Sequence, residues 1–251
     1  MHSPLRALIP VDTLLLAYRS GIFPMADKRE DQDIFWVEPR DRAIIPLTGL
    51  HVSKSLRKVL RSDRFVVTLD RAFERVVRAC AAPRPGQEQT WISERIVLSY
   101  CQLHRAGHAH SVECWLAPLD ADERSPPQLV GGLYGVAFDQ VFCGESMFSR
   151  ADNASKVALA WLVALMRQAG FRLLDCQFMT DHLASMGAIS MPQAMYLKAL
   201  GQARGNPRLS LAQAYEHFSA PDYAMPERQP PQLAAASSPG KRIAQSFTQT
   251  S

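Results

Sequence analysis

Apolar and polar positions along the chain repeat with two different periods, and these periods predict helices and strands in a mixed order. A helical period predicts seven helices, over residues 12–20, 53–62, 70–80, 93–105, 153–169, 181–186 and 192–201. An alternating period predicts five strands, over residues 64–69, 109–116, 129–138, 141–144 and 171–176. Three strands in succession, then a helix, a strand and a helix predict an α+β (α/β layered) fold with a mixed central sheet and one right-handed crossover.

The distribution of proline, glycine and large apolar residues divides the chain into three parts. Residues 1–50 are predicted to form a small N-terminal domain, because prolines and aromatic residues make the segment after the first helix, residues 21–46, irregular. Residues 51–218 hold the predicted sheet and form the main domain. Residues 219–251 are rich in Pro, Gln, Ser and Ala, and we expect a disordered tail.

Composition restricts the class of protein. The longest apolar run, Val157 to Met166, has ten residues, whereas a membrane span needs about 20, so we expect no membrane helix. No secretory signal is visible, and the five cysteines are widely spaced without a C-x-x-C pair, which predicts reduced thiols in a cytoplasmic protein. The net charge of +4 (28 minus 24) means that a polyanionic partner would need a local basic face.

One predicted helix carries such a face. Four cations recur with helical spacing on one side of residues 53–62, namely Lys54, Arg57, Lys58 and Arg61. Four cations so close together repel one another unless an anion lies nearby. The face suits a phosphate backbone, and a solvated surface face explains it equally well on spacing alone.

Polar residues follow two predicted strands at points where burial would be costly. Glu145 stands in the apolar segment Phe142–Ser149, either as a buried carboxylate held by backbone amides or as an anion that holds an ammonium group or steers a proton. Asp175 and Gln177 alternate on a strand, so their side chains are predicted to share a face. The carboxylate would then accept from the amide NH2 group and leave the amide oxygen as an outward acceptor, unless the pair is only a polar patch.

Other chemistry is disfavoured. The histidines at 104, 108 and 110 fit no common zinc spacing, so no metal is expected. The glycines at 131, 132 and 135 lie within a strand and do not open a helix, which argues against a dinucleotide loop. We therefore expect no cofactor.

Several short motifs together resemble the leucyl/phenylalanyl-tRNA–protein transferase family across about residues 14–200. The motifs are Tyr18–Pro24, Thr90–Ser93, Gly107–Glu113, Gly131–Ala137, Phe142–Ser149, Asn153–Lys156 and Asp175–Gln177. The resemblance implies a small N-terminal domain and a GNAT-like acyltransferase domain. It also implies transfer of Leu or Phe from aminoacyl-tRNA to the N-terminal amine of proteins that start with Arg or Lys, which marks them for N-degron degradation. We expect a monomer.

The resemblance also assigns roles to residues. It implies a catalytic set of Asp175, Gln177 and Glu145. It implies that the aminoacyl group and the terminal adenosine are bound by Trp91, Phe142, Ser146, Met147 and Met25. The tRNA would be bound by Lys54, Arg57, Lys58 and Arg61. Met25 stands where the family usually has an aromatic residue, and the chain starts close to the first family helix.

Two other functions remain open at this point. A GNAT acetyltransferase that uses acetyl-CoA would need a glycine-rich turn at the start of the long helix, and residues 149–156 contain none. A non-catalytic paralogue that only binds tRNA or a protein N-terminus would keep the basic face and could lose Asp175 or Gln177, both of which are present.

Overall fold

The computed structural model describes residues 7–83, 89–117, 126–220 and 237–248. A seven-stranded sheet with the order β4-β5-β6-β7-β8-β3-β9 forms its centre. The strands are β3 (Asp41–Ile44), β4 (Val66–Leu69), β5 (Ala109–Leu116), β6 (Gln128–Phe138), β7 (Val141–Ser149), β8 (Leu173–Asp175) and β9 (Ile189–Pro192). Only β7 and β8 pair in parallel among these neighbours, so the predicted α+β fold with a mixed sheet is confirmed. A separate two-stranded sheet joins β1 (Phe23–Met25) to β2 (Phe35–Val37).

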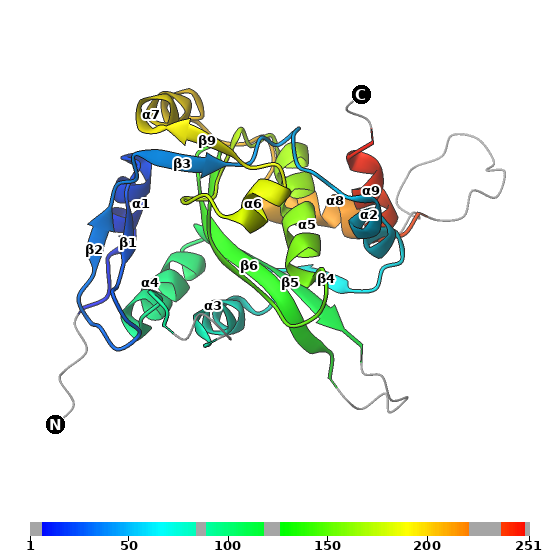
Figure 1. The fold of residues 1–251 in the computed structure, drawn as a ribbon, viewed down its shortest axis with the longest axis horizontal. Helices are drawn as coiled ribbons and strands as arrows, with labels where there is room; N and C mark the ends of the chain where they lie inside the picture. Colours follow the sequence, from blue (N-terminus) through cyan, green and yellow to red (C-terminus); the bar gives the residue numbers. More distant parts are fainter. Residues whose placement is uncertain (1–6, 84–88, 118–125, 221–236, 249–251) are drawn as a thin grey trace.

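Helices cover both faces of the large sheet (Figure 1). On one face lies α5 (Ala154–Ala169), the crossover between the parallel strands, with α2 (Lys54–Arg61), α8 (Leu211–Ser219) and α9 (Pro239–Ser246) at its side. On the other face lie α3 (Phe73–Ala81) and α4 (Glu94–Arg105), next to α1 (Val11–Arg19). The remaining helices, α6 (Asp181–Ser185) and α7 (Gln193–Gln202), flank β9 in the sequence.

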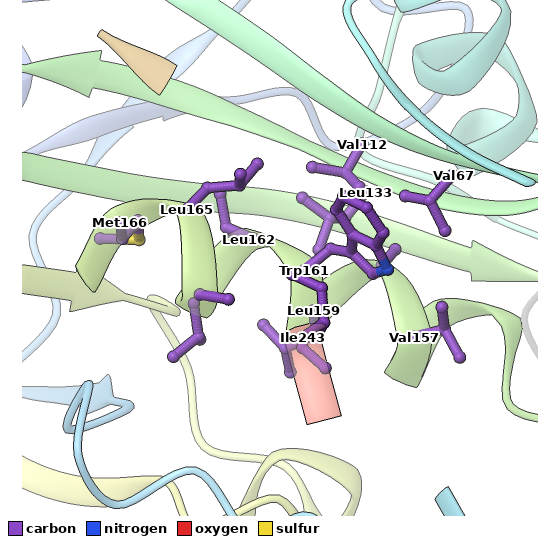
Figure 2. Close-up of a cluster of buried hydrophobic side chains, with 14 of the residues drawn as sticks. Val67, Val112, Leu133, Val157, Leu159, Trp161, Leu162, Leu165, Met166 and Ile243 are labelled. Carbon is purple, nitrogen blue, oxygen red and sulfur yellow. The ribbon is translucent and has the colours of Figure 1, made fainter. Parts of the chain in front are cut away.

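The long helix α5 is buried on almost every side, which explains its apolar sequence. It follows Asn153, which has φ 70°, and it ends at Gly170, which has φ 84° and needs no Cβ in this left-handed conformation. Figure 2 shows Trp161 and Leu162 of this helix among valine and leucine side chains of the sheet and Ile243 of α9. A fully buried leucine contributes about 1.5–3 kcal/mol, so this helix anchors one half of the core.

A second apolar cluster fills the opposite face of the sheet. It joins Tyr18 and Phe23 of the N-terminal segment to residues of α3, α4, β6 and β7. The N-terminal segment also contributes β3, which lies between β8 and β9 in the large sheet. The boundary at residue 50 stays a prediction, but residues on both of its sides share one sheet and one core.

The ends of several elements differ from the prediction. The predicted strand 141–144 continues to Ser149 as β7, and the predicted strand 171–176 shortens to β8. Neither β9 nor α8 was predicted. In β9 the four residues are exposed or half-exposed, so no apolar alternation marks the strand.

The C-terminal part differs from the predicted disorder over residues 237–248, which include α9. Ile243 and Ala244 are fully buried in the core, and the Gly240 amide donates to Asp63 Oδ1 beside α2 (2.8 Å). Two apolar residues at successive positions were too weak a pattern to overcome the polar composition. The remaining positions of that tail, 221–236 and 249–251, lie outside the described residues.

No helix in the described part of the chain is both long and apolar enough to cross a membrane. All five cysteines lie in the described residues, none of them forms a disulfide, and four are buried.

Candidate active site

A break in strand pairing places Glu145. Along β6 and β7, Tyr134 pairs with Ser146 and Gly135 pairs with Gly144, so Glu145 is an extra residue without a partner across the sheet. Such a bulge turns a side chain away from the regular alternation. Glu145 was predicted to follow a strand, but it lies within β7. Its side chain contacts Tyr18 and Tyr100 of the second apolar cluster.

The Glu145 carboxylate is almost buried, at 8% exposure, and three neutral groups donate to it. Its Oε1 accepts from the Tyr18 hydroxyl (2.6 Å) and from Gln177 Nε2 (2.9 Å). Its Oε2 accepts from the Tyr100 hydroxyl (3.1 Å), and the two tyrosine hydroxyls also contact each other. Backbone amides, which the sequence suggested as donors, are not among these donors.

Burial raises the pKa of Glu145 to about 7, and the three donors offset only part of that effect. Burial and the nearby Glu145 also raise the pKa of Tyr18 and of Tyr100. Both phenols therefore stay protonated as donors, while Glu145 can hold or release a proton near neutral pH.

Asp175 ends β8 and is fully buried, but its carboxylate is matched by a cation. Oδ2 accepts from Arg42 Nη2 (2.5 Å) and from the Tyr196 hydroxyl (2.9 Å). Burial opposes the charge on Arg42, but Asp175 and Tyr196 outweigh it, so the pKa of Arg42 lies above its usual value. This site therefore holds a compensated pair of charges.

Gln177 connects the two carboxylates. Its backbone N–H donates to Asp175 Oδ1 (2.8 Å), while its side-chain Nε2 donates to Glu145. Its φ of 64° is left-handed, a conformation that costs a residue with a Cβ about 1–2 kcal/mol. The bond to Asp175 helps to hold that turn.

The predicted geometry of this pair needs correction. Gln177 lies beyond the end of β8 in a turn, so strand alternation does not align it with Asp175. The amide NH2 group is held by Glu145 rather than by Asp175. Because the NH2 group is engaged there, Oε1 is the atom of the Gln177 amide that can accept from a ligand N–H.

The other predicted substrate-binding residues lie on several elements. Met25 and Trp91 are half-buried, pack against the same core cluster and lie close in space, since the Ala26 amide donates to the Trp91 carbonyl (3.3 Å). Ser146 and Met147 of β7 are half-buried beside Glu145. Phe142 is fully buried against Gly135, so its ring has no surface open to a ligand in this conformation.

The predicted basic face lies on α2, which packs beside α9 (Figure 1). Ser53 caps this helix by accepting from the Leu56 amide (3.2 Å), and Leu56 and Leu60 are buried. The opposite side carries three exposed cations and the half-buried Arg57; the exposed ones are Lys54, Lys58 and Arg61.

Four contacting residues were missed by the sequence analysis. Three of them, Tyr18, Tyr100 and Tyr196, lie within predicted helices, where aromatic residues ordinarily signal core. Arg42 lies in β3, a strand of four residues within the N-terminal part where the sequence predicts no regular period. An arginine next to an apolar strand was the one available signal, because a buried cation needs a partner.

The described residues contain no group of three or more His, Cys, Asp or Glu side chains arranged to hold a metal ion. Three cavities of about 290, 420 and 390 Å³ lie at the start of α3, between α2 and α9, and at the start of α5. None of the three is lined by the candidate catalytic residues.

Comparison with known proteins gives one consistent result. Residues 44–201 match the model of the leucyl/phenylalanyl-tRNA protein transferase family, and residues 8–40 match the model of its N-terminal domain. A leucyl/phenylalanyl-tRNA–protein transferase of Novosphingobium aromaticivorans is 60% identical over 196 residues, which cover 78% of this chain and 71% of that protein. Proteins of the same name from Rhizorhabdus wittichii and Rhodospirillum rubrum are 54% and 51% identical, over 80% and 78% of this chain and 77% and 87% of theirs.

Proposed function

This chain belongs to the leucyl/phenylalanyl-tRNA protein transferase family of aminoacyltransferases, and we propose that it moves Leu or Phe from aminoacyl-tRNA to the N-terminal amine of a protein that starts with Arg or Lys. The acceptor would thereby be marked for degradation. We propose that it works as a monomer in the cytoplasm, where charged tRNA is found. One observation carries the assignment of the site: Gln177 is fixed between two buried carboxylates, with its backbone N–H bonded to Asp175 and its side-chain amide bonded to Glu145.

The chemistry asks for positioning more than for a strong base. An aminoacyl ester is already activated, and holding the amine against it supplies most of the advantage. An α-amine has a pKa of about 7.7–8.0, so a useful fraction is neutral near pH 7. Gln177 Oε1 would accept one N–H of that amine and direct its lone pair to the ester carbonyl. The amine loses a proton and the departing ribose oxygen gains one.

Glu145 supports the choice of a cationic acceptor. Its pKa of about 7 lets it carry negative charge at and above neutral pH, close to the amide that would hold the amine. Asp175 is fully buried and saturated by its neighbours, so we assign it no contact with substrate. Its place in the catalytic set would be to hold Gln177.

An apolar site beside Gln177 supports Leu and Phe as donors. Phe178 and Met179 follow Gln177 directly and are 44% and 41% exposed. With Trp91, Met25 and Met147 they would offer apolar surface to a large aminoacyl side chain, and Ser146 a polar contact. Each missing methylene would weaken such binding by about 1–3 kcal/mol. Phe142 would support this surface from behind rather than line it.

We assign the tRNA to the cations of α2. Lys54, Lys58 and Arg61 project from a helix whose other side is anchored in the core, so they form a fixed row of positive charge. Such a row fits the spacing of backbone phosphates better than an isolated charge does. Two relevant controls exist on α7 and just after it, where Lys198 and Arg204 are also exposed.

The function is tested by transfer of radiolabelled Leu or Phe from charged tRNA to acceptor proteins that start with Arg, Lys, Ala or Asp. We expect transfer to the Arg and Lys acceptors and a loss of about 100-fold in kcat in Gln177→Ala. Gln102→Ala, at an exposed glutamine of α4, serves as the matched control and should transfer normally. Absence of transfer by the unaltered protein, while it still binds charged tRNA, would favour the non-catalytic paralogue. Acetyl transfer from acetyl-CoA in its place would favour the acetyltransferase.

The tRNA face is tested by reversing two of its charges. Lys54→Glu with Arg57→Glu should raise the KM for charged tRNA several-fold and reduce the salt dependence of tRNA binding by about one counterion per lost contact. Lys198→Glu with Arg204→Glu should change neither. Equal effects of the two double variants would mean that net charge, and not the α2 face, attracts the tRNA.

A further inference from the structure

We propose that Arg42 is a positioning residue for acyl transfer, which acts through Asp175 on the backbone and the amide of Gln177. The inference rests on the proposed function, because it assigns a second residue to the same reaction. Arg42 touches neither substrate in that scheme. Its role follows from three successive contacts between β3, β8 and the turn after β8.

The first contact anchors the Arg42 guanidinium. Its side chain is 1% exposed, lies with its central carbon 4.3 Å from the centre of the Tyr196 ring and 5.0 Å from that of Phe23, and bonds Asp175 through Nη2. Within the described residues, Nε and Nη1 are buried without a hydrogen-bond partner. The aromatic rings therefore hold the plane of the guanidinium, and a single nitrogen carries its polar contacts.

The second contact completes the surroundings of Asp175. The Tyr196 hydroxyl accepts from Arg42 Nη2 (2.9 Å) and donates to Asp175 Oδ2 (2.9 Å), which closes a triangle of three groups. The Cys143 thiol of β7 also bonds Asp175, and burial first and then Asp175 raise the pKa of that thiol. The only cation that these contacts bring to Asp175 is Arg42.

The third contact passes the position of Asp175 to Gln177. Arg42 bonds Asp175 Oδ2, and the other oxygen, Oδ1, accepts the Gln177 N–H. Ala43, the residue after Arg42, clamps the same turn by its backbone: its N–H donates to the Gln177 carbonyl (3.0 Å) and its carbonyl accepts from Cys176 (2.8 Å). Strand β3 thus holds the turn twice, once through backbone and once through the Arg42 side chain.

Loss of Arg42 would leave Asp175 as a buried carboxylate without a countercharge. Such a group takes up a proton or turns toward water. Either change weakens its bond to the Gln177 amide, and the left-handed turn loses one of its supports. The amide oxygen would then point at the amine less often, and turnover would fall while tRNA binding at α2 persisted.

The test measures kcat and the KM for charged tRNA in variants that keep the buried charges balanced. Arg42→Lys keeps the cation and loses the flat guanidinium, and we expect kcat to fall about 10-fold with KM for charged tRNA within about twofold of the unaltered protein. Arg42→Met combined with Asp175→Asn removes both charges, so no buried charge stays unpaired. We expect that folded variant to lose about 100-fold in kcat.

Each kcat is calculated per protein molecule that binds charged tRNA, so misfolded molecules do not lower it. Arg78→Lys, in an exposed ion pair with Glu94, is the matched control and should keep kcat within about twofold. The inference is overturned if Arg42→Lys has the same kcat as the control. It is also overturned if the double variant Arg42→Met with Asp175→Asn turns over normally. Either result leaves the proposed function standing. Failure of the unaltered protein to transfer overturns the proposed function together with it.

Discussion

Two carboxylates lie on either side of Gln177, and the protein treats them in opposite ways. Asp175 is fully buried with an arginine, while Glu145 is almost as deeply buried with two tyrosines and an amide. Burial raises the Glu145 pKa to about 7, because neutral donors stabilise a carboxylate less than a cation does and offset only part of the effect of burial. Several hydrogen bonds reach each carboxylate, but a cation is among the donors only at Asp175.

The contrast separates two tasks that both require an acidic residue. Asp175 is a fixed part of the frame, since its charge is balanced within the protein. Glu145 can respond to what binds, because an incoming ammonium group would supply the positive charge that its own surroundings lack. Gln177 receives its backbone position from the first and its side-chain direction from the second.

The largest effect should come from removing each charge without changing shape. At pH 7.5, Asp175→Asn should lower the free energy of unfolding by about 3–5 kcal/mol, because it leaves Arg42 buried and unpaired. Glu145→Gln should change it by about 1 kcal/mol or less, because no cation is left behind. Urea denaturation of both variants measures the difference, and similar losses would remove the distinction between the two sites.

The next effect appears in the pH dependence of stability. The native state keeps the Glu145 proton up to about pH 7, whereas the unfolded chain releases it near 4.5. Because the native state binds more protons in that window, the contribution of Glu145 is fully present below pH 4.5 and is lost as the pH rises to 7. Unfolding experiments from pH 4 to 8 should show that the unaltered protein loses about 3 kcal/mol relative to Glu145→Gln. Parallel curves for the two proteins would assign Glu145 an ordinary pKa.

The smallest effect comes from deleting one hydroxyl at each site. Tyr100→Phe removes a donor to Glu145 and should move the pH window upward, with a change of about 1 kcal/mol in stability. Tyr196→Phe removes a donor to Asp175 but leaves Arg42 in place, so the window should stay where it is. Movement of the window in the Tyr196 variant would show that the two carboxylates titrate as one system.

The long elements could be predicted from the sequence because each buries a complete apolar face. The helix α5 and the strands β5 and β6 match their predicted ranges to within one residue, and Gly170 ends the helix. Short elements fared worse, since β9 and α9 are held by contacts with distant segments and carry little periodicity of their own. Tertiary contacts decide such segments, and a local pattern does not record them.

In the candidate site, too, some residues could be predicted from the sequence and others could not. Glu145, Asp175 and Gln177 stood out because polar residues interrupt apolar segments there. Their partners did not, since a tyrosine in a helical stripe looks the same whether its hydroxyl is idle or bonded. The direction of the Gln177 amide depends on a turn of left-handed backbone, which no strand periodicity predicts.

The extra residue in β7 sets sheet regularity against function. Shortening that strand by one position would give β6 and β7 uninterrupted pairing, and an ordinary residue would then take its turn above or below the sheet. The more regular pairing would therefore remove the Glu145 carboxylate from its place beside Tyr18 and Tyr100. A designer who removed this bulge would obtain a more regular sheet without the Glu145 carboxylate in the site. The bulge therefore has to be copied along with the fold.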